Sequence, residues 1–260
     1  MMVVKLGGNA LANMSDLGWI GVMASRISAG ERFVLVHGGG PQIDSELALH
    51  GVSRRFVDGL RYTDEQTYGV VEMVLAGSVQ QQLVRILRSH GLTAVGLTGN
   101  DGNLITATRR SSTSGEDIGQ VGVPAAIEPR VITTLVDAGF LPVISPTSGN
   151  AEGIGFNVNA DLAAAAIAGA LAAECVIFMT DVEGIYRDYP NRESLISQIS
   201  LEDLVKMKEG FTGGMIPKVE AVIEAITAGA REASVIDGRS GEALTALLSG
   251  QPIGTLVTRG

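Results

Sequence analysis

Lysines that stand beside paired glycines are the first candidates for chemistry in this sequence. Lys5 precedes Gly7 and Gly8 at the end of a short apolar run, and Lys218 follows the stretch Thr212-Gly213-Gly214. Glycine lets the backbone approach an anion, and its N–H group can point at that anion. Each lysine adds a positive charge, so both segments predict an anion site. For the first segment, a Gly turn beside a surface lysine is the structural alternative.

The position of Lys218 gives a second argument for function. Two glycines precede a predicted helix over residues 216–229, and Pro217 and Lys218 lie near its start. The helix dipole is positive at that end, so a cation there is unfavourable for the helix alone. A bound anion would offset the repulsion between Lys218 and the positive end of the helix dipole.

A third glycine-rich turn, Gly38-Gly39-Gly40, lies between a predicted strand and a predicted helix. Pro41 suits the first turn of that helix, and N–H groups at a helix start bind anions. The pattern differs from a P-loop, because no Gly-Lys-Ser/Thr follows. His37 precedes this turn, and a structural hydrogen-bonding role is expected for it as readily as a catalytic role.

Arg61, in the stretch Gly-Leu-Arg-Tyr-Thr-Asp, is a candidate for binding a carboxylate through two parallel hydrogen bonds. A solvated arginine is the alternative. Thr63 and Asp64 after it are typical of a helix start.

Polar residues alternate in Asn157-Val158-Asn159-Ala160-Asp161, before an Ala-rich helix. Capping explains one of the three polar side chains, and we expect the others to face one pocket. A further stretch, from Thr180 to Tyr186, leaves a predicted strand at the sheet edge where ligands bind in open α/β sheets.

The elements that must position these residues alternate between strands and helices. Predicted strands are 2–6, 32–36, 93–97, 140–144, 175–179 and 233–236, and predicted helices are 15–29, one after 40, 64–90, 128–138, 158–171, 200–208, 216–229 and 241–248. This order implies βαβ units, hence an α/β fold with a mostly parallel central sheet between helices. The polar segment 103–122, with Arg109 and Arg110, is interpreted as a hairpin or flap with a loose tip.

Composition excludes several classes of protein. The net charge of −9 argues against binding to nucleic acid or to an anionic membrane. The single Cys175 excludes an internal disulfide and favours a reducing compartment. We see neither a signal peptide nor a membrane span, so a cytoplasmic protein is expected.

Together, the six motifs resemble the amino acid kinase family, and within it the branch that phosphorylates the side-chain carboxylate of N-acetyl-L-glutamate in arginine biosynthesis. The resemblance covers nearly the whole chain. It implies an open αβα sandwich like that of carbamate kinase. An N-terminal lobe (1–172) would bind the amino-acid substrate and dimerise, and a C-terminal lobe (173–260) would bind ATP with Mg²⁺.

The resemblance also implies roles for single residues. Lys5 and Lys218 would stabilise the transferring phosphoryl group, and Asp161 would orient both lysines. The N-acetylamino acid would be held by Gly39, Gly40, Arg61 and Asn157. The phosphate oxygens and the adenine and ribose of ATP would be bound by Gly7, Gly8, Thr180, Asp181, Gly184, Tyr186, Phe211 and Thr212.

The chemistry needs no general base, since a carboxylate is already a nucleophile at neutral pH. Acidic residues are sparse around the motifs, so Mg²⁺ would be held mostly by the nucleotide and no protein metal ligand is assigned. Arginine-inhibited relatives carry an extra N-terminal helix, and the first strand here starts at residue 2. We therefore expect a homodimer that arginine does not inhibit.

Two other functions remain open from the sequence. The first is a kinase for an amino acid linked to a small acidic carrier protein, which would need an electropositive docking rim from residues such as Arg54, Arg55, Arg109 and Arg110. The second is a catalytically inactive amino-acid sensor on the same fold. Such a sensor should have lost a lysine or a glycine turn, and both lysines are present.

Overall fold

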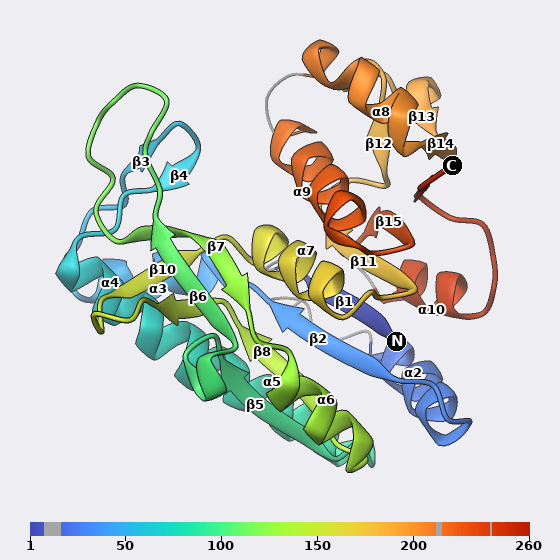
Figure 1. The fold of residues 1–260 in the computed structure, drawn as a ribbon, viewed down its shortest axis with the longest axis horizontal. Coiled ribbons are helices and arrows are strands. Elements are labelled where there is room, and N and C mark those ends of the chain that lie inside the picture. Colours follow the sequence, from blue (N-terminus) through green and yellow to red (C-terminus); the bar gives the residue numbers. More distant parts are fainter. Residues whose placement is uncertain (8–16, 212–214, 240) are drawn as a thin grey trace.

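The computed structural model describes residues 1–7, 17–211, 215–239 and 241–260. One eight-stranded sheet runs through the protein in the order β14-β16-β15-β11-β1-β2-β8-β5 (Figure 1). Its strands are β1 (Met2–Leu6), β2 (Phe33–His37), β5 (Ala94–Thr98), β8 (Leu141–Ser145), β11 (Cys175–Thr180), β14 (Gln198–Ser200), β15 (Glu232–Asp237) and β16 (Thr255–Thr258). Within the described residues, β15–β16 is its one antiparallel pair, which confirms the predicted mostly parallel sheet.

Helices cover both faces of this sheet, because its strands are apolar on both sides. Val3 and Val4 of β1 point to opposite faces and belong to two separate cores. The Val3 face is covered by α6 (Arg130–Asp137), α7 (Ala160–Ala170), α8 (Leu201–Met207) and α9 (Met215–Ala228). The Val4 face is covered by α2 (Gly18–Ser28), α3 (Gly40–Leu49), α4 (Glu65–Glu72), the π-helix η1 (Met73–Val79), α5 (Gln80–Ser89) and α10 (Glu242–Leu248). These three layers confirm the expected αβα sandwich.

A second, four-stranded sheet closes on itself beside the main one. It contains β6 (Ile105–Arg109), β7 (Val121–Ile127), β9 (Thr147–Gly149) and β10 (Gly155–Val158). Strands β6 and β7 pair antiparallel, so the hairpin predicted over 103–122 is confirmed. Strands β9 and β10 escaped prediction, since both are short and contain glycine.

A small hairpin, β3 (Phe56–Val57) and β4 (Leu60–Arg61), carries Arg61. Its two turn residues have positive φ, 50° at Asp58 and 77° at Gly59, as a tight turn of this kind requires. The Asp58 carboxylate accepts hydrogen bonds from the Thr113 N–H and hydroxyl (2.8 and 2.7 Å) and from the Ser114 N–H (3.1 Å). The tip of the 103–122 segment, predicted to be loose, is therefore fastened to this hairpin.

The carboxyl ends of four parallel strands converge at one edge of the main sheet. β1, β2, β8 and β11 end there at Leu6, His37, Ser145 and Thr180. Ligands of open α/β sheets bind outside this edge. Strands from residues 1–172 and from 173–260 lie in the same sheet, and the division into a substrate lobe and a nucleotide lobe stays a prediction.

None of the described helices is both long enough and apolar enough to cross a membrane.

Candidate active site

Lys5 and Asp161 form a largely buried ion pair at the carboxyl edge of the sheet. The alternation along β1 places Lys5 on the face of Val3, which α7 covers. Asp161 lies in the first turn of α7, where the Asn159 side chain accepts a hydrogen bond from its N–H at 2.7 Å. Lys5 Nζ is 2.7 Å from Asp161 Oδ1, and the two side chains are 10% and 18% exposed. Because both side chains are largely buried, removing either one would leave an uncompensated charge inside the protein.

Lys218 has a different acidic partner. It belongs to the first turn of α9, and its Nζ is 3.0 Å from Asp181 Oδ1, just after β11. Burial raises the pKa of Asp181. The hydrogen bond and charge of Lys218 and the charge of Lys5 outweigh that effect and hold the pKa below its usual value. Both lysines therefore act on the same region, while the ion pairs are Lys5–Asp161 and Lys218–Asp181.

A pocket of about 260 Å³ opens beside Lys5. The predicted residues that line it are Lys5, Gly39, Gly40, Arg61, Asn157 and Asp161. Its apolar walls, which the sequence reasoning missed, are Ile43, Phe56, Leu60, Leu75, Val121, Val158 and Pro146. The fold thus gathers the residues predicted to bind the acceptor around one cavity that the Lys5 cation also lines.

Hydrogen bonds hold the walls of this pocket to one another. The Asn157 amide donates to the Thr63 hydroxyl at 3.2 Å, and that hydroxyl donates to the Arg61 carbonyl at 2.8 Å. Arg61 also contacts Asp44 of α3, with Nη1 and Oδ1 2.6 Å apart. Asp44 was not identified from the sequence, where it appears as one more acidic residue on a helix.

Two of the predicted glycines are explained by close contacts. A Cβ at Gly7 would lie 2.8 Å from the Met179 carbonyl oxygen, and one at Gly39 would lie 2.7 Å from Leu75 Cδ2. A larger residue at position 7 would push against the backbone of β11, and one at position 39 would require the Leu75 side chain to move. Gly8 and Thr212 lie outside the described residues.

Two of the residues predicted to bind the nucleotide lie together in a hollow near Lys218. Asp181 and Tyr186 line a hollow of about 160 Å³, together with Glu183, Tyr189, Arg192 and Arg239. Tyr186 is 3% exposed, and its hydroxyl donates to Glu183 at 2.9 Å. This hollow lies on the Lys218 side, next to the Lys218–Asp181 pair.

The other three predicted nucleotide residues have structural contacts. The Thr180 hydroxyl donates to the Val182 carbonyl within its own turn, at 3.1 Å. A Cβ at Gly184 would lie 2.6 Å from Thr255 Oγ1, so close packing accounts for this glycine. Phe211 is 6% exposed and belongs to the core beneath α9.

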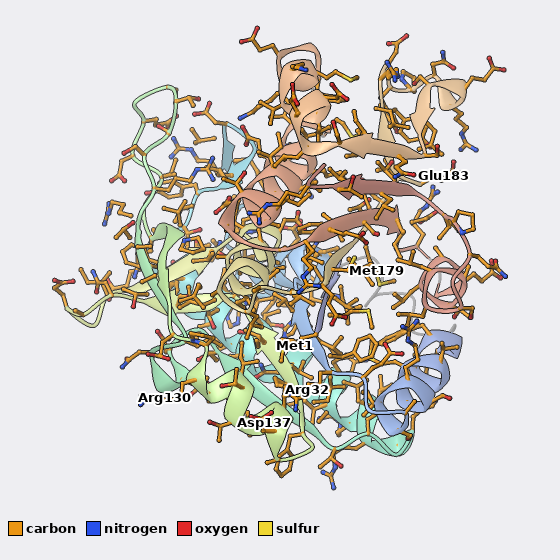
Figure 2. All side chains as sticks on the ribbon, turned by 45° about the vertical axis from the view of Figure 1, so that its right-hand side comes forward. Met1, Arg32, Arg130, Asp137, Met179 and Glu183 are labelled. Carbon is orange, nitrogen blue, oxygen red and sulfur yellow. The ribbon has the colours of Figure 1, made fainter. Side chains whose placement is uncertain are left out.

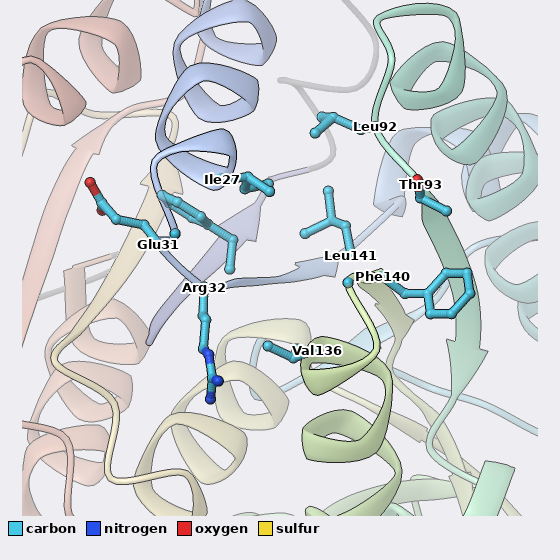
Figure 3. Close-up of a pocket in the computed structure, with 11 residues that line it drawn as sticks. Ile27, Glu31, Arg32, Leu92, Thr93, Val136, Phe140 and Leu141 are labelled. Carbon is cyan, nitrogen blue, oxygen red and sulfur yellow. The ribbon is translucent and has the colours of Figure 1, made fainter.

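Another hollow, of about 180 Å³, lies at the amino ends of the strands (Figure 3). Ile27, Phe33 and Leu141 give it an apolar lining. Arg32 at its rim pairs with Asp137 at 3.0 Å, and both are labelled in Figure 2. The groups suited to phosphoryl transfer lie at the opposite edge, which is therefore the candidate active site.

His37 at the end of β2 has the environment of a structural residue. It is completely buried, and its Nδ1 lies 3.1 Å from the Gly38 carbonyl oxygen. Burial lowers its pKa from 6.5 to about 4, and the contact with Gly38 offsets this only in part. The imidazole is thus neutral at pH 7, which suits a residue that holds the glycine turn in place.

This burial predicts an acid-sensitive fold. Between pH 6.5 and pH 4 the unfolded chain protonates His37 and the folded chain does not, so stability falls as the pH falls. From pH 7 to pH 5 we expect a loss of about 2 kcal/mol from this group. Urea unfolding of the wild type and of His37→Gln at both pH values measures it. Equal losses in the two proteins would contradict the prediction.

The chain is similar to known proteins over nearly its whole length. The sequence model of the amino acid kinase family matches residues 1–237. Acetylglutamate kinases of Acidothermus cellulolyticus and Rhodococcus jostii are 43% and 40% identical, over 98% and 100% of this chain and 90% and 86% of theirs.

Solved structures share the fold. N-acetylglutamate synthase of Neisseria gonorrhoeae, with coenzyme A and N-acetyl-glutamate, gives a TM-score of 0.86 at 24% identity, over 100% of this chain and 59% of that one. Giardia carbamate kinase gives 0.69 at 20% identity, over 99% of this chain and 98% of that one. The chain belongs to the amino acid kinase family.

Proposed function

We propose that this chain transfers the γ-phosphoryl group of ATP to the side-chain carboxylate of N-acetyl-L-glutamate, a step of arginine biosynthesis. The products are N-acetyl-L-glutamyl 5-phosphate and ADP. The observation that carries the proposal is the single cavity that joins Arg61 and Asn157 to Lys5. The curated relatives over the full chain, named acetylglutamate kinases, support the same acceptor.

The residues of the site suit a reaction between two anions. A carboxylate oxygen of the acceptor attacks the γ-phosphorus, and the bond from that phosphorus to the β–γ bridging oxygen breaks. Phosphoryl transfer depends mainly on alignment and on neutralising charge at the transferring group. In this proposal Arg61 and Asn157 fix the acceptor, while Lys5 and Lys218 offset the repulsion between the substrates.

Magnesium enters the proposal as a partner of ATP. Among the residues that the structure describes, no three His, Cys, Asp or Glu side chains form a metal-binding group. Mg²⁺ prefers oxygen ligands and keeps several of its waters, so in this proposal the phosphate oxygens of ATP hold it. When bound, Mg²⁺ would neutralise phosphate charge, and the lysines would act on the charge that remains.

The arginines near the acceptor pocket favour a free amino acid over a carrier-linked one. Arg54 lies 3.6 Å from Asp44, Arg109 lies 3.3 Å from Asp117, and Arg55 pairs with Glu116. The charge of Arg110 acts on Glu224. Arg55 and Arg109 each pair with an acid of the chain, while Arg54 shares Asp44 with Arg61, so the rim offers an acidic carrier protein less positive charge than its four arginines alone would give.

An acceptor panel with ADP release as the readout tests this function. We expect turnover with N-acetyl-L-glutamate. L-Glutamate serves as the control without the acetyl group, and we expect it to be a poor acceptor. Turnover of a carrier-linked amino acid with none of N-acetyl-L-glutamate would refute the proposal. No ADP release with any acceptor would favour the inactive sensor.

We further propose that the protein is a homodimer, as the family resemblance implies. Size-exclusion chromatography with light scattering gives the mass directly, and a mass near six subunits would contradict the proposal. Insensitivity to arginine stays a prediction, which the same ADP assay checks when arginine is added.

A further inference from the structure

Arg61 has an acidic partner that the proposed chemistry does not use. Asp44, on the helix that follows the glycine turn, places Oδ1 2.6 Å from Arg61 Nη1. We propose that Asp44 is a positioning residue: it holds the Arg61 guanidinium at the wall of the acceptor pocket and so sets the affinity for the acceptor's carboxylate. This inference rests on the proposed function, because it concerns how the same pocket binds its acceptor.

Burial explains why Arg61 needs this partner. Its side chain is only 9% exposed, whereas that of Asp44 is 27% exposed. A guanidinium that has lost most of its water is costly unless an opposite charge compensates it. Among the described residues, Arg61 Nη1 and Asp44 Oδ1 are buried without a hydrogen bond of good geometry, despite their close approach. Asp44 therefore holds the guanidinium through the attraction between opposite charges at 2.6 Å.

Two further contacts restrict the orientation of the guanidinium. Arg61 Nη2 donates to the Gly40 carbonyl at 3.4 Å, and Arg61 Cζ lies 5.0 Å from the centre of the Phe56 ring. Both Gly40 and Phe56 line the pocket. Arginine binds a carboxylate with two bonds only when its planar fork faces the ligand. Loss of Asp44 would leave the fork free to turn away from that direction.

A matched control exists on the same carboxylate. Arg54 lies 3.6 Å from Asp44 Oδ2 and is 71% exposed, outside the pocket lining. Exposed ion pairs contribute little, so Arg54→Ala should leave all kinetic constants unchanged. This variant removes a cation near Asp44 without touching the Arg61 contact.

Steady-state kinetics of substituted proteins test the inference. Asp44→Asn preserves shape and removes the charge, and we expect the KM for N-acetyl-L-glutamate to rise about ten-fold. The KM for ATP should stay unchanged, and this constant also reports on the integrity of the fold. Asp44→Glu, which keeps the charge, should recover most of the acceptor affinity. An Asp44→Glu protein as impaired as Asp44→Asn would count against a charge-based role.

A double-mutant cycle with Arg61→Ala decides whether Asp44 acts through Arg61. We expect Asp44→Asn to change the acceptor KM no further once Arg61 is replaced. Additive effects, or a lower KM in Asp44→Asn, would overturn the inference while wild-type turnover persists. Failure of the proposed function looks different, because the wild type itself would then not phosphorylate N-acetyl-L-glutamate.

Discussion

Lys5→Met should lower kcat by about 10²–10³, by analogy with the loss of one preorganised donor from an oxyanion hole. Methionine keeps an unbranched apolar stem in place of a side chain that is 10% exposed, so the packing beside β1 is preserved. The charge is lost where the two anionic substrates would meet. Because that charge acts on the transferring phosphoryl group, kcat and kcat/KM should fall together in the ADP assay.

The partner of Lys5 supplies the control for this prediction. Lys5→Met leaves Asp161, 18% exposed, without its cation, and this alone could disturb the site. The double variant Lys5→Met, Asp161→Asn removes both charges. We expect it to regain melting temperature over Lys5→Met while kcat stays low. Recovery of kcat in the double variant would show that Lys5 serves only to neutralise Asp161.

Much of the fold could be predicted because its strands carry strong local signals. The six predicted strands correspond to β1, β2, β5, β8, β11 and β15, with ends shifted by one residue at most. Five of them are apolar runs that are largely buried, as a parallel sheet covered on both faces requires, and the edge strand β5 is only partly buried. The glycine turns follow from the same logic, since they mark strand ends where the backbone must approach a neighbour or a ligand.

Interactions between distant segments could not be predicted in the same way. Asp44 and Arg61 are joined only because the β3–β4 hairpin folds back over α3, and neither residue carries a local signal for the other. The assignment of Asp161 to both lysines came from resemblance, and the structure adds Asp181 as a second acid. Which carboxylate reaches which lysine depends on where α7 and α9 begin relative to the sheet.

Lys218→Ala should also lower kcat by about 10²–10³, for the same electrostatic reason, but its effect on stability should differ from that of Lys5→Met. Lys218 lies in the first turn of α9, where the helix dipole disfavours a cation. Its partner Asp181 is 59% exposed, so water screens this pair and loss of the lysine leaves no buried charge behind. We therefore expect a melting temperature that is unchanged or slightly higher. Such a result is common at active sites, where residues that serve activity often lower stability.

Lys208→Ala is the matched control for Lys218→Ala. Lys208 Nζ lies 3.0 Å from Glu220 of helix α9, whereas Lys218 Nζ lies 3.0 Å from Asp181 beside the predicted nucleotide site. Removal of Lys208 changes the charge near α9 equally, and kcat should stay at the wild-type value. Equal losses of kcat in both variants would mean that the assay senses the charge of α9 in general. A lower melting temperature for Lys218→Ala would mean that Lys218 supports the fold. A low kcat in a fully stable Lys218→Ala protein is the result that fits a role at the transferring phosphoryl group.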